Sequence, residues 1–249
     1  MQTLSLRVKA VIAYDGSHYL GFQKQTSTNN TIAHAIEKAL RSLQIKSDIV
    51  ASGRTDAGVH ATGQVIHFDL PEFWSDLDKL KINLNRKLKD IEFKHISKTA
   101  PDFHARFWAK KRLYRYVFKT SKPSVFEQKY ISYYSDFNAD LLKKALSYFE
   151  GEHDFKYFQK TGTLTHTTVR NIYKTLYREK NGYHYIYFQA NGFLRAQVRM
   201  MVHAAISCAK KEMTEAQLRE QLACKVKHSS RLAPPEGLYL ARILYNERY

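Results

Sequence analysis

The same order of strands and helices is predicted twice along this chain, and this repeat limits its fold more than any other feature. The spacing of apolar residues gives the first half the order β-α-β-β-α-β, over residues 4–14, 32–43, 47–52, 66–70, 75–88 and 91–98. The second half repeats it with one additional helix, over residues 111–119, 138–149, 169–178, 183–190 and 193–211, a helix from 214, and 237–245. This is the order of a ferredoxin-like unit. We therefore predict an α+β fold of two tandem ferredoxin-like halves.

The boundary between the halves is expected at Thr99-Ala100-Pro101, where the first strand-helix pattern ends. This gives an N-terminal half of residues 1–100 and a C-terminal half of residues 101–249. The sheets of the two halves are expected to join as one antiparallel sheet, with a central basic cleft between the halves.

Several short signals locate the ends of these elements. Thr31 and Asn138 are predicted helix N-caps, and Ser75 is predicted to cap the helix that follows it. Thr214, with Gln217 three residues later, has the spacing of a capping box. Asn181-Gly182 between two alternating segments predicts a tight hairpin.

The charge of the chain points to a polyanionic partner. Forty Lys and Arg residues against 23 Asp and Glu give a net charge of +17, and the stretches 103–126 and 180–211 contain no acidic residue. Seventeen Tyr and fourteen Phe are available to stack on unpaired bases. Because no helix-turn-helix or zinc-finger pattern is present, RNA is favoured over duplex DNA.

Three sequence features bear on location. No apolar run approaches the ~18 residues that a membrane span needs, and residues 1–13 lack the apolar core of a signal peptide. The two cysteines, Cys208 and Cys224, have neither disulfide-rich density nor CxxC spacing. We expect a cytoplasmic protein with no membrane partner.

The segment Gly53–Gly63 is a predicted loop in which Asp56 lies two residues from Arg54. Its three glycines permit backbone conformations that other residues resist. A metal site would need ligands beyond Asp56 and His60, and the loop lacks the order of a phosphate-binding P-loop. One alternative is an aspartate that only caps the loop's backbone. The other is a carboxylate kept ionised by an arginine, as a nucleophile or general base requires.

The string GRTDAGVHATGQVIHF, residues 53–68, resembles the signature of the TruA-type tRNA pseudouridine synthases. Further segments resemble this family in the same order along the chain: 14–16, 21–23, 103–107, 114–116, 151–155, 170–172, 198–199 and 237–240. The chain departs from the family pattern at several places, of which two concern the candidate site. Phe22 stands where the family often has tryptophan, and Arg195-Ala196-Gln197 replaces a more usual His-containing stretch.

The resemblance implies an isomerase that converts uridine to pseudouridine at positions 38, 39 and 40 of the tRNA anticodon stem-loop, without cofactor or metal. It implies that Asp56 is the catalytic carboxylate and that Arg54 helps to displace the base. Tyr114 would stack on the uracil, and Arg199 would pair with the catalytic aspartate. The resemblance also implies a homodimer with the tRNA lying across both subunits.

Four more residues are expected to bind substrate: His60, His104, Arg106 and Phe193. The sequence leaves open whether His104 and Arg106 line the RNA path or only pack beside it. It also leaves open whether Phe193 is instead a core residue. Sequence also leaves open whether Asp56 attacks the ribose C1′ or first takes a proton from C2′.

Two other classes of protein compete with this interpretation. A non-catalytic RNA-binding protein could use the same scaffold, but a carboxylate among basic residues would only repel phosphate. A hydrolase of glycosidic bonds usually needs a second carboxyl group as acid, and none accompanies Asp56 in the loop.

Overall fold

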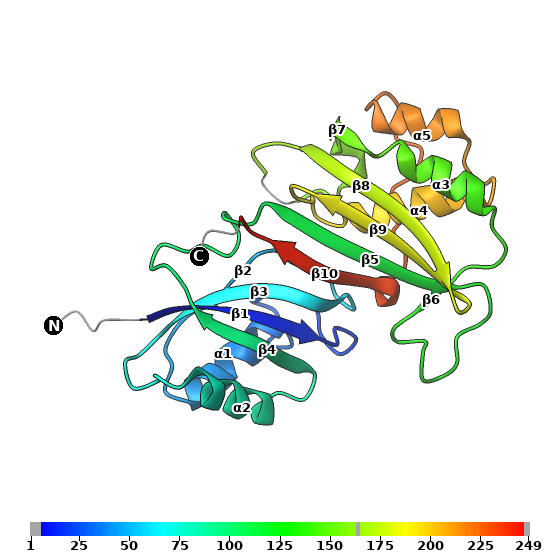
Figure 1. The fold of residues 1–249 in the computed structure, drawn as a ribbon. Helices are drawn as coiled ribbons and strands as arrows, with labels where there is room; N and C mark the ends of the chain where they lie inside the picture. The colour runs from blue at the N-terminus through cyan, green and yellow to red at the C-terminus, as the bar shows by residue number, and fades with distance from the viewer. Residues whose placement is uncertain (1–5, 163–164, 247–249) are drawn as a thin grey trace. The chain divides into compact units, whose positions relative to one another are not determined.

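The computed structural model describes residues 6–162 and 165–246, which form two compact units (Figure 1). Unit 1 contains the described residues of Met1–Lys110 and of Leu240–Tyr249, and unit 2 is Lys111–Tyr239. Ten strands and five α-helices lie in the described residues, and the strands pair mostly antiparallel. The predicted α+β class is confirmed. The units differ from the predicted halves, because residues 101–110 and 240–246 group with unit 1.

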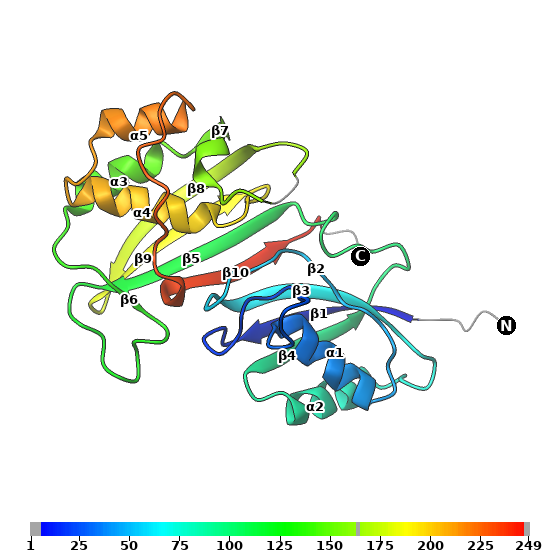
Figure 2. The same ribbon diagram turned by 180° about the vertical axis from the view of Figure 1, so that it is seen from behind.

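Unit 1 has the predicted element order. Its elements are β1 (Leu6–Tyr14), α1 (Ile32–Ser42), β2 (Val50–Ala51), β3 (His60–Leu70), α2 (Leu77–Lys87), β4 (Ile91–Lys98) and the part of β10 (Leu238–Leu244) that begins at Leu240. The strand order is β4-β1-β3-β10, and β2 also pairs with β3. Both helices lie on one face of this sheet (Figures 1 and 2). Alternate residues of β1, such as Val8 and Ile12, are fully buried, and so is Ile36 of α1.

Unit 2 repeats a strand-helix order with additional short elements. It contains β5 (Lys111–Lys119), β6 (Ser132–Tyr133), α3 (Ala139–Ser147), β7 (Gly151–Asp154), the 3-10 helix Lys156–Phe158, β8 (Val169–Lys180), β9 (Tyr183–Ala190), α4 (Gln197–Ala209), α5 (Glu215–Leu222) and the 3-10 helix Pro235–Gly237. The strand order is β5-β9-β8-β7, and β6 runs parallel to β5. Helices α3 and α4 cover one face of these strands (Figures 1 and 2). Tyr116, Phe118 and Phe188 are buried on that face.

The local signals are confirmed at most positions. Thr31, Asn138 and Thr214 each accept a hydrogen bond from the first turn of their helix, and Thr214 forms the full capping box with Gln217. Asn181 and Gly182 have φ of 54° and 73°, as a two-residue hairpin turn requires.

Several element predictions were wrong in detail. The cap of α2 is Asp76, one residue after Ser75, because its carboxylate accepts the Lys79 amide. The strand predicted over 47–52 has only the two residues of β2.

The helix predicted from residue 193 begins at Gln197. Ala196 has φ 61°, a left-handed conformation that cannot continue a right-handed helix. The joining of the two sheets and the basic cleft between them stay predictions, as does the tandem ferredoxin-like description.

Candidate active site

The loop with Asp56 and Arg54 joins β2 to β3 and is shorter than predicted, because residues 60–63 belong to β3. The N-terminal end of the loop is held in place by the buried side chain of Gln64. The Gln64 amide Nε2 donates to the Gly53 carbonyl at 2.8 Å, and its Oε1 accepts from the Ser52 hydroxyl at 2.7 Å. The first residues of the loop are therefore held against the strand that follows it.

The middle of the loop is held by the segment after β1. The Tyr14 hydroxyl and the buried Thr55 Oγ1 form a hydrogen bond of 2.8 Å, and the Phe22 amide donates to the Thr55 carbonyl at 3.1 Å. Gly21 has φ 101°, and a Cβ there would lie 3.0 Å from the Thr55 carbonyl oxygen. Thr55 directly precedes Asp56, so these contacts fix the backbone from which the carboxylate extends.

The exit of the loop rests on Gly16 and His60. A Cβ on Gly16 would lie 2.0 Å from the Val59 carbonyl oxygen, so only glycine fits this close approach. The Gly16 amide donates to His60 Nδ1 at 3.1 Å, and His60 is 2 % exposed. This geometry favours His60 as a residue that positions the loop rather than one that contacts RNA.

Asp56 and Arg54 extend from this braced backbone toward the surface. Arg54 is exposed and Asp56 is half-buried, whereas Thr55 between them is buried. The Val59 amide donates to the Asp56 carbonyl at 3.2 Å, which closes a tight turn. A carboxylate that is accessible but fixed by its backbone suits a group that must meet a reacting atom at a defined place.

His104 and Arg106 lie together in a turn of unit 1. His104 Nδ1 accepts the amides of Arg106 and Phe107, both at 3.2 Å, and its ring stacks on Phe107 with centroids 4.2 Å apart. The Arg106 guanidinium lies 5.9 Å from the Phe107 ring, which is 73 % exposed. Sequence reasoning missed Phe107, although an aromatic residue next to the predicted Arg106 was the available signal.

In unit 2, Tyr114 and Phe193 contact each other. Tyr114 lies on β5 and is 8 % exposed, and its ring meets the Phe193 ring edge to face with centroids 5.1 Å apart. This contact packs Phe193 against the sheet, and the ring of Phe193 is nevertheless only half-buried.

Arg199 lies in the first turn of α4. Its Nε donates to the Ala233 carbonyl at 2.7 Å, and the Ala233 amide donates back to the Arg199 carbonyl at 3.0 Å. The buried Gln197 side chain accepts the Leu194 amide at 2.8 Å and thereby ties the start of α4. The departure from the family pattern at residues 195–197 therefore forms an ordered helix start.

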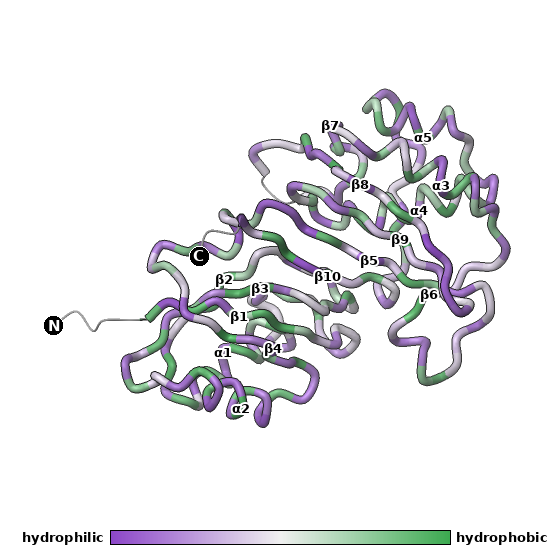
Figure 3. Tube along the Cα trace, viewed as in Figure 1, coloured by the Kyte–Doolittle hydropathy of each residue, from purple (hydrophilic) through white to green (hydrophobic). Residues whose placement is uncertain are grey.

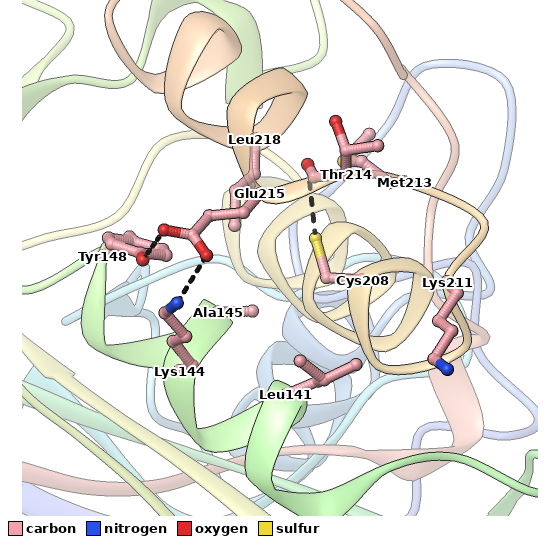
Figure 4. Close-up of a pocket in the computed structure, with 10 residues that line it drawn as sticks. All are labelled: Leu141, Lys144, Ala145, Tyr148, Cys208, Lys211, Met213, Thr214, Glu215 and Leu218. Carbon is pink, nitrogen blue, oxygen red and sulfur yellow. Dashed lines mark hydrogen bonds and ion pairs between the residues drawn. The ribbon is translucent and has the colours of Figure 1, made fainter.

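A separate hollow lies among α3, α4 and α5 of unit 2 and contains none of the predicted site residues (Figure 4). Its volume is about 220 Å³. Glu215 accepts from Lys144 at 2.7 Å and from the Tyr148 hydroxyl. Burial raises the pKa of the Cys208 thiol to about 11, so this thiol stays neutral and is no nucleophile.

Within the described residues, no group of three His, Cys, Asp or Glu side chains is placed to hold a metal ion. None of the helices in that part of the chain is long and apolar enough to cross a membrane.

Comparison with known proteins identifies the family. The family model described as tRNA pseudouridine synthase matches residues 10–108 and 145–246. The chain belongs to the tRNA pseudouridine synthase family. The matched residues include the Asp56 loop, the segment that braces it and Arg199, whereas Tyr114 lies outside them.

Two curated relatives show how far the similarity to this family extends. A protein of Helicobacter hepaticus named tRNA pseudouridine synthase A is 38 % identical over 243 residues, covering 95 % of this chain and 98 % of that one. A protein of the same name from Campylobacter jejuni is 35 % identical over 241 residues, covering 96 % of this chain and 100 % of that one.

Among solved structures, an archaeal box H/ACA sRNP Nop10-Cbf5 complex matches with a TM-score of 0.35 and 10 % identity. The match covers 80 % of this chain and 43 % of that one. A similarity this low supports no argument about the present chain.

Proposed function

We propose that this chain is an isomerase that converts uridine to pseudouridine in tRNA, at positions 38, 39 and 40 of the anticodon stem-loop, with Asp56 as the catalytic carboxylate. The observation that carries the proposal is the Asp56 loop itself. In a member of this family, an accessible carboxylate extends from a backbone held by Tyr14, Gly16 and Gln64. The three tRNA positions rest on the sequence resemblance alone.

The reaction is a rearrangement in which no atom is added. The bond between uracil N1 and ribose C1′ breaks, the uracil turns, and a bond forms between C5 and C1′. The proton on C5 leaves and N1 gains one. Asp56 either attacks C1′ and is later displaced, or takes a proton from C2′ and returns it. Both routes use the same ionised carboxylate, and neither needs a cofactor.

Access to the uridine requires the base to leave the helical stack, which costs a few kcal/mol. We assign Arg54, which is exposed beside Asp56, to the space that the base vacates. Tyr114 is assigned to stacking on the uracil, an interaction of about 1–3 kcal/mol per base, with Phe193 supporting its ring at 5.1 Å. Arg199 is assigned to pairing with Asp56, since a neighbouring guanidinium favours the ionised carboxylate.

His104 and Arg106 are assigned to the RNA path, because their turn presents a cation and an exposed aromatic ring together. His60 is assigned to positioning of the loop through Gly16. We also propose a homodimer with one tRNA across both subunits, on the sequence resemblance. Cytoplasmic residence is proposed from the tRNA substrate and the two free cysteines.

The test is the release of tritium from tRNA that carries uridine labelled at C5. That hydrogen leaves only if a new bond forms at C5. We expect release by the wild type and none by Asp56→Asn, with tRNA binding by the variant within a few-fold of wild type. Asp78→Asn is the matched control, because Asp78 is a surface aspartate of α2 whose side chain is 92 % exposed. It should release tritium at the wild-type rate.

Tritium release by Asp56→Asn would remove Asp56 from the centre of the reaction. Binding of tRNA without release by the wild type would leave a non-catalytic RNA-binding protein. Release of free uracil would indicate a hydrolase.

A further inference from the structure

An interior network of hydroxyl groups in unit 2 connects strand β5 to the backbone that binds Arg199. Strand β5 carries both hydrophilic and hydrophobic residues (Figure 3). Tyr116 has the same parity on it as Tyr114, and its side chain is fully buried on the face that the helices cover. A buried hydroxyl is costly unless it is hydrogen-bonded, so the partners of this group indicate what it holds.

The Tyr116 hydroxyl lies within hydrogen-bond distance of three oxygen atoms. These are Ser132 Oγ at 2.8 Å, the Pro234 carbonyl at 3.1 Å and the Tyr134 hydroxyl at 3.2 Å. A carbonyl can only accept, so the contact with Pro234 requires the Tyr116 proton. Burial raises the pKa of Tyr116 well above its ordinary value, and the hydroxyl therefore keeps that proton.

The segment 233–237 packs closely against β5 and β6. A Cβ on Gly237 would lie 2.6 Å from both Ser132 Oγ and the Val117 carbonyl oxygen, and 2.9 Å from Tyr116 Cζ. Only glycine permits this approach. The two residues after Ala233 are prolines, whose rings fix φ. The segment is therefore short of freedom, and a displacement of Pro234 is transmitted to Ala233.

Ala233 is the residue of this segment that binds Arg199. It is fully buried, its carbonyl accepts from Arg199 Nε at 2.7 Å, and its amide donates to the Arg199 carbonyl at 3.0 Å. Nε carries a single hydrogen and is coplanar with both Nη nitrogens. The place of the Ala233 carbonyl therefore sets the plane of the guanidinium and leaves the two Nη nitrogens as the end that meets an anion.

The charge of Arg199 also acts on the network itself. Burial raises the pKa of Tyr134 to about 12, and the positive charge of Arg199 opposes this rise. The Ser132 hydroxyl donates to the Glu236 carboxylate at 3.2 Å. The network is thus close to Arg199 in electrostatic as well as in covalent terms.

We infer that Tyr116 is a positioning residue for the reaction: its hydroxyl holds Pro234 and, through the adjacent Ala233 carbonyl, sets the direction in which Arg199 presents its guanidinium. The part of Arg199 in the reaction rests on the proposed function. Strand β5 then serves the same reaction twice, with Tyr114 assigned to the uracil and Tyr116 to Arg199. A network that only stabilises unit 2 is the outcome that the test must separate from this one.

The first test follows the Nε–H group of Arg199 by NMR of the full chain labelled with ¹⁵N. Its signal is assigned by its absence in Arg199→Lys. Tyr116→Phe keeps the ring and removes the hydroxyl, and exchange of this hydrogen with solvent should become about tenfold faster or more, because the Ala233 carbonyl is no longer held. The matched control is Tyr177→Phe, which removes a hydroxyl of unit 2 that is bonded to His184 Nδ1 at 2.8 Å. It should leave the exchange rate within twofold of wild type.

The second test measures tritium release by the same variants. In Tyr116→Phe, kcat should fall about tenfold or more, since small misplacements of a reacting group cost up to ~100-fold. KM for tRNA should stay within about twofold, because a fully buried side chain does not contact the substrate. Lysine has no Nε, so adding Tyr116→Phe to Arg199→Lys should change kcat less than twofold, as expected of two residues that act through one link. Tyr177→Phe should keep both constants.

Ser132→Ala is a second variant that leaves the Tyr116 ring untouched. It removes another hydroxyl of the network and should change exchange and kcat in the same directions, by about threefold. Exchange at Arg199 within twofold of wild type in both Tyr116→Phe and Ser132→Ala would overturn the inference. Faster exchange with unchanged kcat, or an equal fall of kcat in the Arg199→Lys background, would overturn it as well. A wild type that releases no tritium would refute the proposed function, and the exchange rates would still decide whether Tyr116 holds Arg199.

Discussion

Replacing Tyr14 by phenylalanine tests whether the contacts beneath Asp56 serve catalysis or only stability. Tyr14 is 4 % exposed, so its ring remains packed in the variant, and the 2.8 Å bond between its hydroxyl and Thr55 Oγ1 is lost. A buried hydrogen bond contributes about 0.5–1.5 kcal/mol, and a polar group left unpaired adds about 1–3 kcal/mol. Because the Thr55 hydroxyl can rotate, we expect a loss of about 1–2 kcal/mol in the free energy of unfolding.

The catalytic effect should exceed the effect on stability. Thr55 is covalently joined to Asp56, and small misplacements of a reacting group cost up to ~100-fold in rate. We expect kcat for tritium release to fall about tenfold or more. KM for tRNA should stay within about twofold, because a residue buried in unit 1 does not contact the substrate.

The control is Tyr177→Phe in unit 2, which removes a hydroxyl bonded to His184 Nδ1 at the same distance of 2.8 Å. Urea unfolding should show a loss of stability in both variants, smaller in Tyr177→Phe because that bond is only partly buried, whereas kcat should fall only in Tyr14→Phe. A Tyr14→Phe enzyme with kcat within twofold of wild type would refute the positioning argument. Equal losses of kcat in both variants would do the same.

Two further predictions concern stability. Gly16→Ala should lower the unfolding free energy by about 2 kcal/mol or more, because its Cβ would lie 2.0 Å from the Val59 carbonyl oxygen; an unchanged urea midpoint would contradict the close approach. Burial lowers the pKa of His67 from 6.5 to about 4, so between these values the unfolded chain binds a proton that the folded chain does not. Stability should fall as pH decreases from 6.5 to 4, by about 2–3 kcal/mol for this group. A His67→Gln variant should lose that part of the pH dependence of its urea midpoint; the same pH dependence as wild type would contradict it.

Local chemistry explains why most elements could be predicted from the sequence. The caps at Thr31, Asn138 and Thr214 depend on a side chain and an amide two or three residues away, and the Asn181-Gly182 turn depends on two adjacent residues. Interactions of this range are encoded in short strings.

Non-local contacts explain the errors. The strand predicted over 47–52 has a suitable composition, but only Val50 and Ala51 pair with β3. The start of α4 moves to Gln197 because the left-handed Ala196 and the Gln197 side chain define an entry that no helical pattern shows. Alanine carries no signal for φ near 61°.

In the candidate site, too, the local features could be predicted from the sequence and the long-range contacts could not. The glycine spacing and the neighbouring charges drew attention to Asp56 and Arg54 from sequence alone. The bracing by Tyr14 and Gly16 joins segments about forty residues apart, and it became evident only with the structure. The burial of His60 could not be foreseen either, because histidine occurs both inside and on the surface of proteins.

The membership of β10 in unit 1 has a consequence for the order in which the protein can mature on the ribosome. Strand β3 lies between β1 and β10, and nearly all of its residues are buried. A Cβ on Gly63 would lie 2.3 Å from the Ala241 carbonyl oxygen, so the two backbones meet closely. The residues that cover this edge of β3 are synthesised after all of unit 2. A nascent unit 1 therefore exposes an unpaired strand edge during that interval, when it is open to wrong partners.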